Sequence, residues 1–147
     1  MFRGRYQHTL DPKGRVSVPA KYRNALAQFQ EAGLIVVPNG EALEVHPLEE
    51  WERIEGRINE RSMFEAEIRK VGRLYISKAK EVEIDSAGRI LLPPDSRAAC
   101  GLEKDVTLVG SGRRYFEIWD RKAFDEYELR NGDGLPSGFD RLAQLGV

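Results

Sequence analysis

The sequence contains one nine-residue motif twice, at residues 11–19 (DPKGRVSVP) and at residues 85–93 (DSAGRILLP). At a constant offset of 74 residues, both copies carry Asp, Gly, Arg and Pro in matching positions, with apolar residues at the sixth and eighth positions. The same offset pairs Arg23 with Arg97. Repetition at a fixed period indicates that one structural unit occurs twice along the chain. This feature constrains the fold more than any other.

Each copy of the motif predicts the tip of a β-hairpin. Asp at the first position and Gly at the fourth are preferred in a type I turn, and Pro12 supplies the favoured φ at the second position. After the turn, residues 15–18 alternate between polar and apolar, as a half-buried strand does. Residues 5–10 and 81–84 predict the strands that lead into the two turns.

The tips have two interpretations. In the first, Asp and Gly only build the turn, and the Arg is an exposed partner for the Asp. In the second, the Arg has a function of its own. Turn geometry explains the Asp and the Gly, but it does not require an Arg directly after the Gly in both copies. Repetition therefore favours the second interpretation.

The remaining pattern repeats the same order of elements in each half. Further strands are predicted at residues 34–37, 43–46, 105–109 and 115–119, with turns at residues 38–40 and 110–112. Helices are predicted at residues 20–29, 48–61, 63–72, 95–101 and from residue 120, with Phe124, Tyr127 and Leu129 facing inward. Trp51 has the helical spacing of a core anchor rather than that of a ligand platform. Residues 135–147 are expected to be flexible or to pack on a neighbour.

Each half is too small to be stable alone. A unit of about 74 residues with a few short strands buries little apolar surface. We therefore expect the two halves to complete each other by exchanging strands. The predicted division is a first repeat with a helical insert (1–75), a second repeat (76–130) and a C-terminal tail (131–147).

Charge is distributed unevenly along the chain. The net charge of −1 alone argues against a nucleic-acid partner. However, residues 1–23 carry six basic side chains and one acidic side chain, whereas residues 48–70 carry seven Glu against five Arg or Lys. The electric field of such a charge distribution can direct the basic end toward DNA while the acidic region faces away.

Composition narrows the protein class further. The chain is 41% apolar and 32% charged, which is typical of a soluble globular protein. The longest apolar run, residues 34–37, is far too short to span a membrane, and the N-terminus lacks a signal-peptide core. The single cysteine excludes an internal disulfide and fits a reducing cytoplasm.

No catalytic or metal-binding motif is present in the sequence. His8, His46 and Cys100 lack the spacing of a zinc site, and no phosphate loop, dinucleotide fingerprint or nucleophile elbow occurs. Cys100 lies in an apolar helical pattern, which favours a small buried residue over a nucleophile. We therefore expect no enzyme activity, no cofactor and no metal.

Residues 1–15, continuing through residues 19–23, resemble the opening of the bacterial MraZ family, and residues 85–97 are similar to the second motif of that family. The resemblance covers roughly residues 1–130 in a specific order and spacing. Ser96 departs from the family pattern, which usually has a large apolar residue there. The resemblance implies an α+β fold, namely a small tandem AbrB-like swapped-hairpin β-barrel flanked by helices, which assembles into a ring.

The resemblance also implies a function. The family consists of sequence-specific DNA-binding regulators of the division and cell-wall gene cluster that contains their own gene, so we expect a cytoplasmic, nucleoid-associated homo-oligomer. In that family the Asp-x-x-x-Arg elements carry DNA recognition. This role maps onto Asp11 with Arg15 and onto Asp85 with Arg89.

The expected interface follows from these residues. Arg15 and Arg89 can bind a guanine edge bidentately in the major groove of double-stranded DNA. The turn-supporting residues are Asp11, Gly14, Asp85 and Gly88, and the expected phosphate contacts are Lys13, Arg3 and Arg5. The first tip is the more basic, so we expect it to dominate the affinity. Several tips on one oligomer would bind repeated short boxes more tightly through effective concentration.

One alternative to the regulator stays open from the residues alone. The same barrel could serve as a protein-interaction or assembly module, for which the basic N-terminus is only a solvated surface. Strong salt dependence of DNA binding would favour the regulator, because phosphate contacts release counterions. An enzyme with an unrecognised site has little support.

Overall fold

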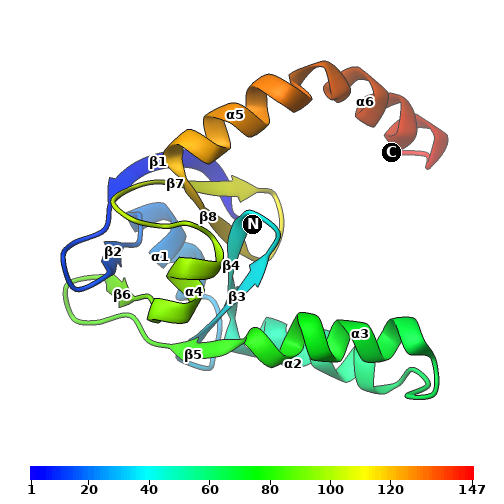
Figure 1. The fold of residues 1–147 in the computed structure, drawn as a ribbon, viewed down its shortest axis with the longest axis horizontal. Coiled ribbons are helices and arrows are strands. Elements are labelled where there is room, and N and C mark those ends of the chain that lie inside the picture. The colour runs from blue at the N-terminus through cyan, green and yellow to red at the C-terminus, as the bar shows by residue number, and fades with distance from the viewer.

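The computed structural model describes residues 1–147 and has an α+β architecture (Figure 1). The strands are β1 (Arg3–Thr9), β2 (Arg15–Ser17), β3 (Leu34–Asn39), β4 (Ala42–Pro47), β5 (Lys80–Val82), β6 (Arg89–Leu91), β7 (Asp105–Ser111) and β8 (Phe116–Asp120). The helices are α1 (Ala20–Leu26), α2 (Leu48–Asn59), α3 (Ala66–Leu74), α4 (Pro94–Ala99), α5 (Arg121–Asn131) and α6 (Leu135–Gln144), with short 3₁₀ turns η1 (Ile76–Lys78) and η2 (Gly132–Gly134).

The strands are exchanged between the two halves of the chain. Six of them form one antiparallel sheet in the order β1-β7-β8-β4-β3-β5, and the other two form a separate ribbon, β2-β6. The pairs β1–β7, β3–β5, β4–β8 and β2–β6 each join one strand from the first half to one from the second. Only β3–β4 and β7–β8 are hairpins within a half. The mutual completion expected from the small size of each half is therefore present.

The predicted pairing at the two motifs is corrected by this exchange. In the first half only the turn of the hairpin remains, because β1 pairs with β7 and β2 pairs with β6. In the second half one bridge, between Ile84 and Ile90, is retained. The sheet ends at β1 and β5 and does not close through hydrogen bonds, so the predicted barrel is not confirmed.

An approximate twofold axis relates the halves. Val16 lies opposite Ile90 in the ribbon, and Glu44 lies opposite Glu117 in the β4–β8 pair. Each pair joins equivalent positions of the two repeats, at offsets of 74 and 73 residues. Equivalent residues can face each other across an antiparallel pair only where a local twofold passes between them. The axis therefore passes through both the ribbon and the sheet.

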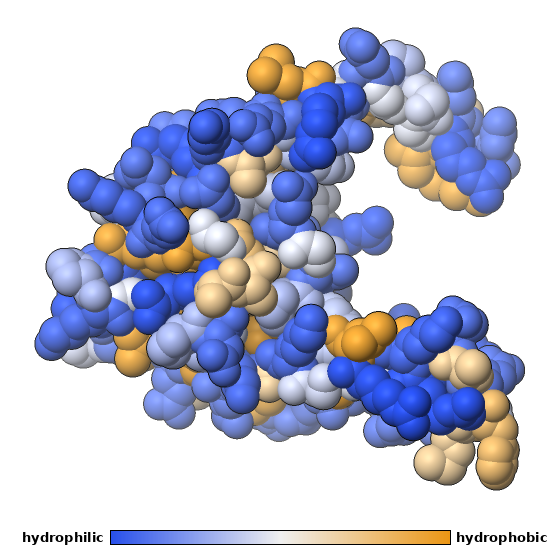
Figure 2. Space-filling model, in the orientation of Figure 1, coloured by the Kyte–Doolittle hydropathy of each residue, from blue (hydrophilic) through white to orange (hydrophobic).

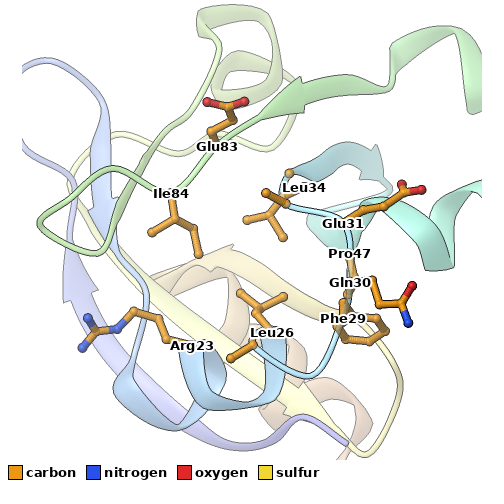
Figure 3. Close-up of a pocket in the computed structure, with 12 residues that line it drawn as sticks. Arg23, Leu26, Phe29, Gln30, Glu31, Leu34, Pro47, Glu83 and Ile84 are labelled. Atoms are coloured by element: carbon orange, nitrogen blue, oxygen red, sulfur yellow. The ribbon is translucent and has the colours of Figure 1, made fainter.

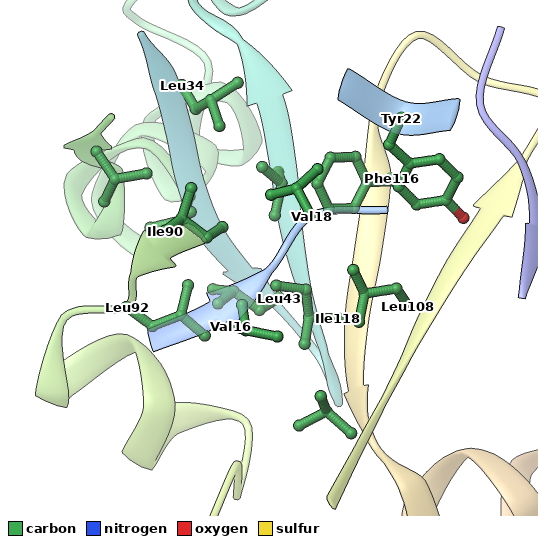
Figure 4. Packing of buried hydrophobic residues seen from close by; sticks show 14 of the residues in the cluster. Val16, Val18, Tyr22, Leu34, Leu43, Ile90, Leu92, Leu108, Phe116 and Ile118 are labelled. Carbon is green, nitrogen blue, oxygen red and sulfur yellow. The ribbon is translucent and has the colours of Figure 1, made fainter. Parts of the chain in front are cut away.

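The main core lies between the sheet and the ribbon (Figure 4). It contains nineteen buried residues from both halves. Val16 and Ile90, both fully buried, point from the ribbon into this core, where Val16 lies beside Leu43 and the neighbouring Val18 lies beside Phe116. Each such side chain contributes about 1.5–3 kcal/mol by leaving water. This packing fixes the ribbon, and with it the turns that flank the ribbon.

Two helical arms project from the sheet and leave an open space between them (Figures 1 and 2). The first arm, α2 with α3, packs Trp51 against Ile35 and Val37. The second arm begins with α5, which packs Phe124 against Trp119, and continues through η2 into α6. Apolar surface gathers along both arms (Figure 2). No helix is both long and apolar enough to cross a membrane.

Several predicted element boundaries are corrected. The tail, expected to be flexible or to pack on a neighbour, contains the helix α6, and α1 ends at Leu26 instead of at residue 29. Gly72 lies inside α3 and does not end it, since a glycine within a helix weakens it by only about 1 kcal/mol. Leu129 is exposed instead of inward. Gly110 lies within β7, where it pairs with Gly4 of β1, and not at a turn. A Cβ at this position would clash with the backbone of Phe2 and Arg3.

Candidate nucleic-acid interface

The first tip is a turn closed by the Asp11 carboxylate. One of its oxygens, Oδ1, accepts the backbone N–H groups of Lys13 and Arg15, each at 2.9 Å, and Oδ2 accepts Arg15 Nε at 2.6 Å. The backbone N–H of Arg15 is the main cause that holds the pKa of Asp11 below its ordinary value. Gly14 has a φ of +86°, a conformation that strongly favours glycine. The Asp11 carboxylate, with both oxygens hydrogen-bonded, thus holds the Arg15 side chain in place.

The second tip repeats these contacts. The Asp85 carboxylate accepts the backbone N–H groups of Ala87 and Arg89 at 2.9 Å, and its Oδ2 accepts Arg89 Nε at 3.3 Å. The backbone N–H of Arg89 is the main cause that lowers the pKa of Asp85. Gly88 has a φ of +77°. The same sequence therefore builds the same turn in both halves.

The ribbon brings the two tips together on one face. Because Val16 and Ile90 point into the core, the alternation of a strand turns Arg15 and Arg89 outward from it. Arg89 Nη1 also lies 3.9 Å from Asp11 Oδ2 in the other tip. The side chains of Arg15 and Arg89 are 29% and 34% exposed, so both remain open to a ligand.

Backbone hydrogen bonds lock each tip to the opposite half. Val18 N donates to Gly88 O at 2.9 Å, and Leu92 N donates to Gly14 O at 3.0 Å. The two bonds are related by the offset of the repeat. Each glycine is thus hydrogen-bonded to a residue near the end of the other motif, which joins the two tips.

The predicted phosphate contacts are not all gathered at the tips. Lys13 is exposed on the first turn. Arg3 and Arg5 lie toward the far end of β1, about 20 Å along the strand in the case of Arg3. The guanidinium of Arg5 forms an ion pair with Glu128 at 2.5 Å and lies 4.9 Å from the ring centroid of Phe124. The structure therefore unites Lys13, Arg15 and Arg89 and places Arg3 and Arg5 elsewhere.

Two tip residues, Arg23 and Arg97, were missed by the sequence reasoning. A Cβ added to Gly14 would lie 2.7 Å from Arg97 Cζ, and one added to Gly88 would lie 2.7 Å from Arg23 Nη1. Each arginine therefore lies directly against the glycine of the other repeat. The offset of 74 residues already paired them, but only the strand exchange shows what they contact.

A pocket of about 500 Å³ lies beside the second tip (Figure 3). Leu26, Leu34 and Ile84 point toward one another inside it, whereas Arg23 extends away from them. The volume is within the range of small-molecule sites, and the apolar lining suits an apolar group. No group of three or more His, Cys, Asp or Glu side chains is arranged to hold a metal ion.

The buried polar groups outside the tips support the fold. Glu44 is 4% exposed, and its carboxylate contacts His46 Nε2 at 3.0 Å and accepts hydrogen bonds from Tyr75 and from Asn39. Burial raises the pKa of Glu44, but these hydrogen bonds outweigh it and keep the pKa below the ordinary value. The cluster lies under the first arm and holds that arm on the sheet.

Cys100 is buried, in agreement with its apolar sequence pattern. Burial raises the pKa of its thiol to about 11, although the charge of Lys78 opposes the shift. The thiol therefore stays protonated near neutral pH, and a thiol is a far weaker nucleophile than a thiolate.

Comparison with known proteins places these features in a family. The profile of the MraZ protein family, an antitoxin-like group by its description, matches residues 1–74 and residues 75–144. The chain is similar to the transcriptional regulator MraZ of Nitrosospira multiformis, with 42% identity over 92% of this chain and 95% of the relative. It is 38% identical to the protein of the same name from Syntrophobacter fumaroxidans, over 99% of this chain and 97% of the relative. The MraZ of Acetivibrio thermocellus is 35% identical over the full length of both chains.

Proposed function

The chain belongs to the MraZ family, and on that premise we propose that it is a sequence-specific DNA-binding transcriptional regulator of the division and cell-wall gene cluster that contains its own gene. The observation that carries the proposal is the pair of arginines on the outer face of the ribbon. Each is held by an aspartate of its own turn. Under this proposal the chain acts by binding alone, without catalysis, cofactor or metal.

The ribbon suits the major groove of DNA. A two-stranded ribbon can enter that groove, and a guanidinium can donate two parallel hydrogen bonds to O6 and N7 of guanine. Asp11 and Asp85 would act as supports, because their oxygens are already occupied by the turn and by the arginine. Lys13 would contact a phosphate beside the first tip.

Arg3 and Arg5 belong to the proposal as outer phosphate contacts. They lie along β1, away from the tips, so they would reach the DNA backbone outside the bases that the tips read. Arg5 would first have to give up its ion pair with Glu128. Its share of the affinity is therefore expected to be smaller than that of Lys13.

Homo-oligomerisation would raise the affinity, and the proposed assembly is a ring in which the swapped-hairpin halves form a barrel. A single tip touches few base pairs, whereas several tips on one assembly would bind repeated short boxes through effective concentration, by roughly 10²-fold or more. The arms carry exposed apolar side chains that suit subunit contacts, including Met63, Phe64, Leu74, Phe139 and Leu145. The proposed location is the cytoplasm, in association with the nucleoid.

A fluorescence-anisotropy titration tests the proposal. Labelled DNA from just upstream of the protein's own operon is compared with a scrambled fragment, for wild type and Arg15→Ala, at several salt concentrations. We expect salt-sensitive, sequence-dependent binding that Arg15→Ala weakens by about 10²-fold. Light scattering of both proteins controls for assembly.

Two other outcomes would redirect the assignment. Equal binding to the scrambled fragment would return the protein to the interaction-module class, which the exposed apolar arms also suit. Loss of binding together with loss of the oligomer would mean that Arg15 is structural.

A further inference from the structure

Two arginines outside the motifs cross from one repeat to the tip of the other. Arg97, at the end of α4, lies against Gly14, with Cζ, Nε and Nη2 at 2.7, 2.8 and 3.1 Å from the position of an added Cβ. Arg23 on α1 lies against Gly88 in the same way, with Nη1, Cζ and Cδ at 2.7, 3.1 and 3.2 Å. Each guanidinium therefore lies against the backbone of a turn that belongs to the other half.

The exposure of the tips reflects this cover. Gly14 and Gly88 are buried, although the residue before each of them, Lys13 or Ala87, is exposed. Glycine has no side chain to bury, so other groups must exclude water from it. At both tips the nearest side-chain atoms are those of the crossing arginine.

Most of the hydrogen-bonding capacity of these two arginines is unused. No carboxylate lies within 4.0 Å of either guanidinium, in contrast to Arg15 and Arg89, which are ion-paired. Arg97 makes one side-chain hydrogen bond, from Nε to Leu92 O at 3.2 Å, and Arg23 makes none. A guanidinium has five N–H donors and stays charged at all physiological pH values.

The first tip also combines Arg97 with a second cation. Arg97 and Lys13 line one hollow, which lies between residues 81–83 and residues 91–97. Glu81 and Glu83 line the same hollow, but neither is ion-paired with the two cations. Lys13 and Arg97 are therefore two cations beside Arg15, the proposed base contact of this tip. They suit the DNA backbone, because phosphate oxygens accept charge-assisted hydrogen bonds.

We infer that Arg23 and Arg97 bind DNA phosphates, and that each of them serves the tip of the opposite repeat. The inference rests on the proposed function and adds two binding residues to it. Arg97 would hold the phosphate beside the base read by Arg15, and Arg23 would do the same beside Arg89. Each half of the chain then supplies the base-reading residue of one tip and a backbone contact of the other.

A purely structural role, in which the arginines only cover the glycines, makes a different prediction. Cover depends on the methylene stem and the flat face of the side chain, not on its charge. A phosphate contact depends on the charge and appears in the salt dependence of DNA binding. The two roles are therefore separable.

The experiment measures log K against log salt for the upstream DNA fragment with Arg97→Met and Arg23→Met. Methionine keeps an unbranched stem and removes the charge. We expect each variant to lower the magnitude of the salt slope by about 1 for each engaged tip, with the melting temperature close to that of wild type. Arg61→Met is the matched control, because Arg61 is exposed in the first arm and forms no ion pair. The control should leave the slope unchanged.

A second substitution keeps the inference testable if the methionine variants are unstable. Arg97→Lys and Arg23→Lys retain the charge but lose the planar cover. They should restore the wild-type salt slope. If the arginines only cover the glycines, the lysine variants should instead have the same defect as the methionine variants, because both lose the planar group. An unchanged slope in the methionine variants would overturn the inference.

The exchange between repeats has its own signature. Arg97→Met combined with Lys13→Ala should be non-additive in DNA affinity by more than about twofold, because both residues serve one tip. Arg23→Met combined with Lys13→Ala should be closer to additive. The reverse order would contradict the assignment of each arginine to the opposite tip.

Failure of the inference is distinguishable from failure of the proposed function. If wild type binds its upstream DNA specifically and Arg15→Ala strongly weakens that binding, while the methionine variants behave as wild type, only the inference is wrong. If wild type shows no preference over scrambled DNA, the proposed function fails and the inference fails with it.

Discussion

The two tips are built from the same contacts but differ in how tightly those contacts close. Arg15 Nε lies 2.6 Å from Asp11 Oδ2, whereas Arg89 Nε lies 3.3 Å from Asp85 Oδ2. Asp11 also faces Arg89, while no ion pair joins Asp85 to Arg15. The turn-building contacts are thus shared, and the surrounding charges have diverged. Two copies of one motif can therefore differ in their contact distances and in the charges around them.

The arms show the same divergence on a larger scale. Each follows the last strand of a half, β4 or β8, and the first helix of each is anchored through a tryptophan. Trp51 belongs to α2 itself, whereas Trp119 belongs to β8 and contacts Phe124 of α5. The first arm seals a buried polar cluster, with Trp51 only 1% exposed. The second leaves Tyr127 at 42% exposure. The outer helix of each arm, α3 or α6, has no buried residue. The first arm is the more firmly attached.

The largest expected effect tests this contrast between the arms. Trp51→Ala should lower the free energy of unfolding by about 3–5 kcal/mol, because it removes a fully buried ring that also contacts His46 and Tyr75. Trp119→Ala should cost less, near the lower end of that range. Chemical denaturation at a fixed protein concentration measures both, and a larger loss for Trp119→Ala would contradict the contrast.

The next effect separates the two tips by DNA affinity. Arg15→Ala should weaken specific binding by about 10²-fold and Arg89→Ala by about fivefold, within the 1–3 kcal/mol of a bidentate guanine contact. The difference is expected because Lys13 supplements only the first tip. Anisotropy titrations at one salt concentration compare the two. Equal losses of DNA affinity in the two variants would contradict the prediction that the first tip dominates.

The smallest effect is a dependence of stability on acid pH. Asp11 and Asp85 have pKa values below the ordinary 3.8, chiefly because backbone N–H groups of their turns donate to the charged form. The folded protein therefore releases these protons more readily than the unfolded chain does. The stabilisation is complete above the ordinary pKa and is lost as pH falls through the folded pKa.

Substitution by asparagine should expose that dependence. Asp11→Asn should flatten the loss of stability below about pH 4 more than Asp85→Asn does, because Asp11 faces two arginines. Melting temperatures between pH 3 and pH 7 provide the measurement. Parallel profiles for wild type and both variants would rule out a contribution from the tips.

Local features of the fold could be predicted from the sequence, and long-range ones could not. The apolar run at residues 34–37 and the pattern at residues 105–109 identified strands correctly, since such patterns depend only on residues near one another in the sequence. The partners of β1 and β2 were missed, because pairing is decided by which apolar faces meet across the whole chain. Gly110 was assigned to a turn because its close approach to Phe2 is visible only in three dimensions.

The candidate site shows the same limit. The motif placed Asp11, Arg15, Asp85 and Arg89 at turns, and the structure brings these turns together on one ribbon. The sequence could not place Arg5 beside Glu128, a residue more than a hundred positions away. Nor could it place Arg23 and Arg97 against the glycines, since that contact depends on the exchange of strands.

The exchange of strands also sets the order in which the chain can acquire structure during its synthesis. The first strand to leave the ribosome, β1, has its partner in β7, and the register joins Arg3 to Ser111. Until β7 emerges, β1 has no partner, and five of the six strand pairings need at least one strand from the second half. Contacts so distant along the chain slow folding. The apolar strand faces of the nascent first repeat therefore stay uncovered until most of the protein has been translated.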